Sequence, residues 1–127
     1  MKDIKFIIPL PPVTKKNTSR ILINRKTGKP FVAPSEAFVK YQRNCFPVVK
    51  ALGINRPINV KALYYMDTKR KVDLNNLHNA LHDVMVHYGM IADDNSSIVA
   101  STDGSRVLYD KANPRTEVVI TFYDSSP

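Results

Sequence analysis

A chain of 127 residues has room for one ordinary domain and is too short for two. Its lysines and arginines total 19 against 11 acidic residues, and the resulting net charge of +8 would attract polyanions such as nucleic acids. The single cysteine, Cys45, excludes an intramolecular disulfide and a cysteine-based zinc site. No run approaches the roughly 20 apolar residues of a membrane span, so we expect no membrane contact and a cytoplasmic location.

The first elements predicted in chain order are a strand and a hairpin. Residues 5–9 predict a strand, which the following prolines end. Two short apolar runs, 21–23 and 31–32, flank a polar loop over residues 24–29. This pattern predicts a β-hairpin, whose loop carries the positive charges of Arg25, Lys26 and Lys29.

A first helix is predicted after this hairpin. Ser35 is a good N-cap, and Gly53 supplies a stop. Between these two residues, apolar side chains recur at helical spacing. They are Phe38, Tyr41, Cys45, Val48, Val49 and Leu52. We interpret Cys45 as a small core residue of this helix.

The second half of the chain predicts a strand, a longer helix and closing strands. Residues 57–66 alternate between apolar and polar side chains, which favours a strand. Residues 74–87 keep their apolar side chains on one helical face, and Gly89 ends that helix.

Three further strands are predicted near the C-terminus. Residues 97–101 and 106–109 are short candidates, whereas residues 117–123 alternate clearly. The order of elements predicts a single α+β domain over residues 1–127. We expect a mixed β-sheet with two main helices packed on one of its faces, in two layers.

Charged residues cluster around the two ends of the second predicted helix. Asp73 stands at its start, just after Lys69, Arg70 and Lys71, and the pair Asp93–Asp94 follows its end. Carboxylates suit Mg²⁺, which can support phosphodiester hydrolysis, while the cations would hold phosphates. The acidic pair would have to return along a later strand to meet Asp73. The plainer alternatives are that Asp73 is a helix N-cap and that Asp93–Asp94 is a polar turn.

The segment Asp73-Leu74-Asn75-Asn76-Leu77, with the helix, Gly89 and Asp93-Asp94 after it, resembles the signature of RusA-type Holliday-junction resolvases. Members of that family typically read Asp-Leu-Asp-Asn-Leu, then a helix, a glycine and a paired Asp-Asp. Residues 9–12 with Asn17 are similar to the family's opening, and residues 115–122 are similar to its closing strand. The likeness spans nearly the whole chain.

The resemblance implies a homodimeric crossover junction endodeoxyribonuclease of recombination and repair, of a kind common in phages and prophages. Such an enzyme uses Mg²⁺, with Mn²⁺ as the alternative ion, to nick four-way DNA junctions symmetrically. The resemblance implies Asp73, Asn75 and Asp94 as catalytic metal ligands, with Asp93 as an auxiliary carboxylate. Asn75 replaces the usual second aspartate and brings no negative charge, so metal affinity should fall. Asn79 stands where some members carry a lysine, and the missing lysine removes either a phosphate contact or a stabiliser of developing charge.

Two basic regions are expected to contact DNA rather than solvent alone. The first lies at the start of the second helix and consists of Lys69, Arg70, Lys71 and Asn76. The second lies before and within the predicted hairpin and consists of Lys15, Lys16, Asn17 and Arg20, with the hairpin loop. The alternative for both regions is an ordinary solvated surface.

His78 and His82 are four residues apart on the second helix, a spacing that can hold a transition metal. We expect instead that they lie on the polar side, opposite Leu77 and Leu81, and face solvent or DNA. The four glycines are not clustered, so we expect no nucleotide cofactor.

Two other hypotheses remain beside the resolvase. A non-catalytic DNA-binding module would keep the fold and the basic surface. A basic structural protein would use Asp73 only as a helix cap.

Overall fold

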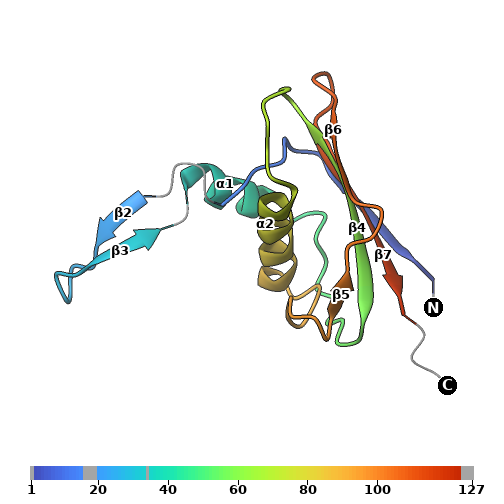
Figure 1. Cartoon of the computed structure of the whole chain (residues 1–127). Helices are drawn as coiled ribbons and strands as arrows, with labels where there is room; N and C mark the ends of the chain where they lie inside the picture. Colours follow the sequence, from blue (N-terminus) through green and yellow to red (C-terminus); the bar gives the residue numbers. More distant parts are fainter. Residues whose placement is uncertain (1, 16–19, 34, 124–127) are drawn as a thin grey trace.

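The protein consists of a mixed β-sheet, two helices on one face of that sheet and a separate β-hairpin (Figure 1). The computed structural model describes residues 2–15, 20–33 and 35–123. In chain order the elements are β1 (Ile4–Ile8), β2 (Arg20–Ile23), β3 (Pro30–Ala33), α1 (Glu36–Asn44), β4 (Ile58–Met66), α2 (Leu74–His87), β5 (Val99–Ser101), β6 (Arg106–Tyr109) and β7 (Arg115–Phe122). The predicted α+β class, the mixed sheet and the two helices are confirmed.

The main sheet has the order β1–β7–β4, and β5 and β6 both pair with the remaining edge of β4. Strand β7 is antiparallel to both β1 and β4, whereas β5 and β6 are parallel to β4. Strand β5 pairs with the beginning of β4 at Ile58, and β6 pairs with its end between Leu63 and Met66. After α2, the chain first reaches the beginning of β4 through β5. It reaches the end of β4, which is the end closer to the start of α2 in sequence, only through β6.

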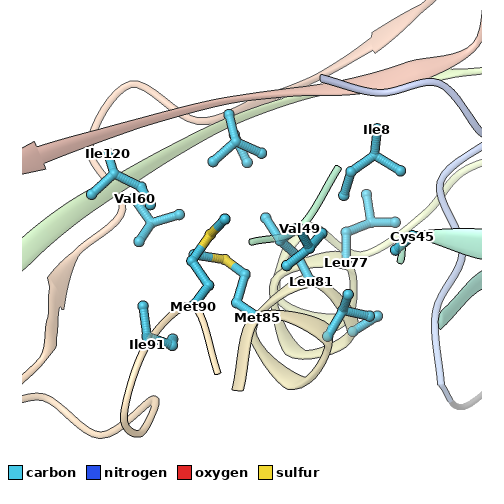
Figure 2. Close-up of a cluster of buried hydrophobic side chains, with 14 of the residues drawn as sticks. Ile8, Cys45, Val49, Val60, Leu77, Leu81, Met85, Met90, Ile91 and Ile120 are labelled. Carbon is cyan, nitrogen blue, oxygen red and sulfur yellow. The ribbon is translucent and has the colours of Figure 1, made fainter. Parts of the chain in front are cut away.

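Alternation along the long strands gives the sheet one buried face. Ile58, Val60 and Ala62 of β4 are buried, as are Val118 and Ile120 of β7. Figure 2 shows side chains of the sheet and of α2 filling the space between the two layers, with Met90 between Val60 of the sheet and Met85 of the helix. Burial of this apolar surface is the main force that holds α2 to the sheet.

Helix α1 is shorter than predicted. Its N-cap is Ser35, whose Oγ accepts a hydrogen bond from the Phe38 amide at 3.1 Å, as expected. The helix ends at Asn44, although its apolar spacing continues to Leu52. Pro47 explains the difference, because proline lacks the amide hydrogen that a further helical turn needs. Only turns continue from there, and Leu52 is exposed.

Helix α2 has the bounds predicted from its periodicity. It ends before Gly89, whose φ of 74° is the left-handed conformation that glycine adopts most readily. Within the described parts of the chain, neither helix combines the length and the apolar character needed to cross a membrane.

Candidate nucleic-acid interface

The start of α2 is held by Asp73, which acts as its N-cap. The Asp73 backbone is extended, and its carboxylate accepts a hydrogen bond from the Asn75 amide at 2.9 Å. This interaction satisfies one of the amides that the first helical turn leaves without a partner. The capping role expected as the plainer alternative is therefore confirmed, while metal binding by Asp73 stays a prediction.

The basic run before this cap lies on the surface. Lys69, Arg70 and Lys71 are all exposed in the loop between β4 and α2. The Lys69 ammonium lies 5.1 Å from the centre of the Tyr109 ring, a cation–π contact. A shallow cavity of about 300 Å³ lies between this loop and β6 and is lined in part by Lys69, Arg70 and Tyr109.

Tyr109 is a candidate that sequence reasoning missed. It is exposed on β6, where its backbone pairs with Met66 at the end of β4. The parallel pairing of these two strands brings Tyr109 to the basic loop. No local signal in the sequence indicates that pairing, because the two strands are separated by the whole of α2.

The acidic pair forms the polar turn that was the simpler expectation. The Asp94 amide donates to the Asp93 carboxylate at 2.7 Å, and the Asn95 side chain donates to the same carboxylate at 3.1 Å. Partial desolvation, the adjacent Asp93 side chain and the nearby Asp83 carboxylate raise the pKa of Asp94.

Helix α2 separates the two groups of predicted metal ligands within one chain. Asp73 and Asn75 lie at its beginning, whereas Asp94 lies within electrostatic reach of Asp83, about 15 Å further along the helix axis. Figure 1 shows the chain leaving the far end of α2 before it enters β5. Among residues 2–15, 20–33 and 35–123, no three His, Cys, Asp or Glu side chains gather closely enough to hold a metal ion. The four predicted ligands therefore do not surround a single ion in one chain.

A cleft of about 280 Å³ lies beside α2 and contains two of the predicted DNA contacts. It is lined by Lys15, Asn76, Asn79 and Asp83. The three helical residues share one face because they are three and four positions apart. The Lys15 ammonium forms a salt bridge with the Asp83 carboxylate, so this cleft carries little net charge. Asp83 was not among the predicted site residues, although its helical spacing from Asn76 and Asn79 was visible in the sequence.

The expectation for the two histidines of α2 is wrong. His78 and His82 are only 7% and 8% exposed, and neither Nε2 atom has a hydrogen-bond partner among the described residues. The His78 Nδ1 atom is 2.7 Å from the Tyr64 hydroxyl, and the two imidazole rings stack with their centres 5.5 Å apart. The reason is that α2 is buried on the side that carries His78 and His82 as well as on the side that carries Leu77. The prediction assumed a helix with one buried face and one exposed face.

Burial makes both imidazoles poor bases. Desolvation lowers the pKa of His78. Desolvation, together with repulsion from His78, lowers the pKa of His82 to about 4, while the Asp83 carboxylate partly opposes this effect. Both side chains are therefore neutral at pH 7, and they add no positive charge to a DNA-binding surface.

Several predicted contacts lie outside the described residues. Lys16 and Asn17 fall in the first gap, and the side chain of Arg20 is likewise not described. The loop of the hairpin is described, and Arg25, Lys26 and Lys29 are exposed there. The predicted hairpin itself is confirmed as the antiparallel pair β2–β3.

No protein-family model matches this chain, and a search of curated proteins finds no similar sequence.

Proposed function

We propose that this protein is a cytoplasmic, homodimeric protein that binds four-way DNA junctions and nicks them in a metal-dependent reaction, as RusA-type resolvases do. The observation that carries the binding part is the exposed run Lys69, Arg70 and Lys71 beside the exposed ring of Tyr109. Cations of this kind bind phosphates, and an aromatic ring offers a surface for a base or a sugar. The three cations lie just before Asp73, the N-cap of α2, and Tyr109 comes from β6.

The proposed binding would recognise shape more than base sequence. Phosphate contacts position a protein on DNA and carry no sequence information by themselves. A protein with a net charge of +8 would also show strong salt dependence, because each phosphate contact releases counterions. Homodimerisation suits this substrate, since two symmetric nicks in a four-way junction call for two equivalent active sites.

The catalytic part of the proposal rests on the sequence motif. Mg²⁺ or Mn²⁺ would supply a Lewis acid and an activated water at the scissile phosphate. The residues proposed to hold it are Asp73, Asn75 and Asp94, with Asp93 as a further carboxylate. Asp73 is already engaged as a helix cap, and Asn75 brings no charge, so this donor set is weaker than one with three carboxylates.

One observation favours a non-catalytic DNA-binding protein as the second candidate. Asp73 and Asn75 lie at one end of α2 and the Asp93–Asp94 turn lies beyond the other, so a single chain does not assemble these ligands. The basic surface does not depend on that assembly. Under this second candidate the protein binds four-way junctions and leaves every strand intact.

The deciding experiment measures binding and nicking of a mobile four-way junction in parallel. The protein is compared with its Asn75→Asp and Asp94→Asn variants, in Mg²⁺ and in Mn²⁺. Paired symmetric nicks by the unmodified chain that disappear in Asp94→Asn support the resolvase. Binding without nicking in either metal, by the unmodified chain and by Asn75→Asp alike, supports the second candidate. Nicking that appears only in Asn75→Asp would instead show that the ligands assemble and that Asn75 disables them. A lack of preference for the junction over linear duplex would refute both.

A further inference from the structure

The hairpin β2–β3 stands apart from the rest of the molecule. Its two strands pair with each other and with no strand of the main sheet, and Figure 1 shows it extending away from the helices. An isolated two-stranded hairpin is at best marginally stable in water. We call the hairpin β2–β3 the arm, because it extends away from the helices. Contact with a partner would stabilise it.

Both sides of this arm carry apolar side chains without cover. The register pairs Ile21 with Val32, so these two residues share one side with Ile23, and the pair Leu22–Phe31 takes the other side. Ile21, Ile23 and Val32 are 76%, 67% and 73% exposed. Leu22 and Phe31 are exposed as well. Large apolar side chains gathered in this way mark a contact surface rather than ordinary surface variation.

The charge of the arm identifies the kind of partner. Residues 21–33 contain three cations, Arg25, Lys26 and Lys29, and no acidic residue. All three cations are exposed in the loop at the end of the hairpin. A polyanion would attract this cationic tip. The arm thus combines a cationic tip with apolar sides, which together match the phosphates and the base faces of a nucleic acid.

We propose that the hairpin β2–β3 inserts into the branch point of a four-way DNA junction. The cationic tip contacts phosphates, and the Ile21–Ile23–Val32 side packs against bases exposed at the branch. This inference rests on the proposed function and adds to it the element that distinguishes a branch from a linear duplex. A two-stranded ribbon is narrow enough to enter a major groove about 12 Å wide.

The apolar side chains explain why a branch should be favoured. Isoleucine, leucine and phenylalanine wedges are used by other proteins to open base steps, and opening an intact stack costs a few kcal/mol. Bases at a branch have already lost part of their stacking, so the same insertion costs less there. The cationic tip alone would bind any DNA, whereas the apolar sides would discriminate.

The test uses two sets of substitutions in the full-length protein. The apolar variant is Ile21→Thr/Ile23→Thr/Val32→Thr, which keeps β-branched residues suited to a strand and removes apolar surface. The tip variant is Arg25→Gln/Lys26→Gln/Lys29→Gln. Ile7→Thr is the matched control, because Ile7 is an exposed isoleucine in β1 of the main sheet. Circular dichroism and sedimentation establish that each variant folds and keeps its oligomeric state.

Two readouts follow DNA binding. The first is affinity for a four-way junction and for a linear duplex of the same length. The second is the fluorescence of 2-aminopurine placed at the branch, which rises when that base loses its stacking. We expect the apolar variant to lose about tenfold or more in junction affinity and most of the fluorescence rise, with duplex affinity changed by less than about threefold. The tip variant should lose affinity for both DNAs, with a salt slope smaller by about 2 to 3.

The outcomes separate the arm from the proposed function. If the unmodified protein prefers the junction and the apolar variant matches it in both readouts, the arm proposal fails alone. It fails as well if the apolar variant changes the sedimenting mass, because the apolar side would then be an interface between copies. If the unmodified protein does not prefer the junction over duplex, the proposed function fails and the arm proposal fails with it. If Ile7→Thr causes the same loss as the apolar variant, the effect does not belong to the arm.

Discussion

Acid should destabilise this protein through the buried imidazole of His82. In the unfolded chain a histidine binds a proton near pH 6.5, whereas burial lowers the pKa of His82 in the folded state to about 4. The unfolded state therefore gains a proton first as the pH falls. The stability linked to His82 is complete above pH 6.5 and is progressively lost between pH 6.5 and 4.

The size of this effect follows from the two pKa values. A difference of about 2.5 pH units corresponds to about 3 kcal/mol when the pH lies below both values, and to about 2 kcal/mol at pH 5. Because the side chain is only 8% exposed, solvent screening reduces this figure little. His78 should add to the loss in the same direction, since burial also lowers its pKa.

Urea unfolding at pH 7.5, 6 and 5 measures the loss directly. A change of about 2 kcal/mol moves the urea midpoint by roughly 1 M for a domain of this size. Carboxylates also titrate at low pH, so the comparison needs His82→Leu. This variant removes the ionisable ring and a buried nitrogen that has no hydrogen-bond partner in the described part of the chain. The variant should lose about 2 kcal/mol less than the unmodified protein between pH 7.5 and 5. An equal loss in the two proteins would refute the burial of a neutral His82.

Three further predictions concern the cap, the core and the basic loop. Asp73→Ala should lower the free energy of unfolding by about 1 kcal/mol. Asp73→Ser keeps a capping oxygen, so its free energy of unfolding should stay close to that of the unmodified protein. Equal thermal midpoints for the two variants would contradict the capping role. Met85→Ala removes a fully buried side chain and should cost about 2 to 5 kcal/mol in urea unfolding, while a loss below 1 kcal/mol would contradict the packing of α2 on the sheet. Lys69→Gln/Arg70→Gln/Lys71→Gln should weaken DNA binding with little effect on folding and reduce the salt slope by about 2 to 3, and an unchanged slope would exclude phosphate contacts by this loop.

Local patterns in the sequence predicted the elements well where one signal dominated. The bounds of α2 followed from its apolar period and Gly89, and the hairpin followed from two apolar runs around a polar loop. The predicted first helix extends beyond the observed end of α1 because the apolar spacing continues past Asn44. Pro47, which is visible in the sequence, ends the helix. Two local signals compete in this segment, so the end of α1 can be predicted correctly without any tertiary information.

The candidate site depended on contacts between distant parts of the chain, and these were not predictable in the same way. The Tyr64 hydroxyl meets His78 because β4 lies beneath α2, and that pairing decides that the imidazole is buried. Tyr109 reaches Lys69 through the parallel pairing of β6 with β4. The Asp93–Asp94 turn stays near the end of α2 because Ile91 bridges to Ile54 and the Ala92 amide donates to the Ile54 carbonyl at 2.8 Å. Periodicity within one segment contains none of this information.

The burial of the two histidines also limits which surface can attract DNA. The cleft beside α2 is lined by Asn76, Asn79 and Asp83 of that helix, and the salt bridge between Lys15 and Asp83 leaves the cleft nearly neutral. A polyanion gains little electrostatic energy from a neutral cleft. In the proposed function, the attraction comes from the basic loop before α2 and from the cationic tip of the hairpin. Asp94 belongs to neither of these two surfaces, so Asp94→Asn should remove any cleavage while leaving the proposed binding surface intact.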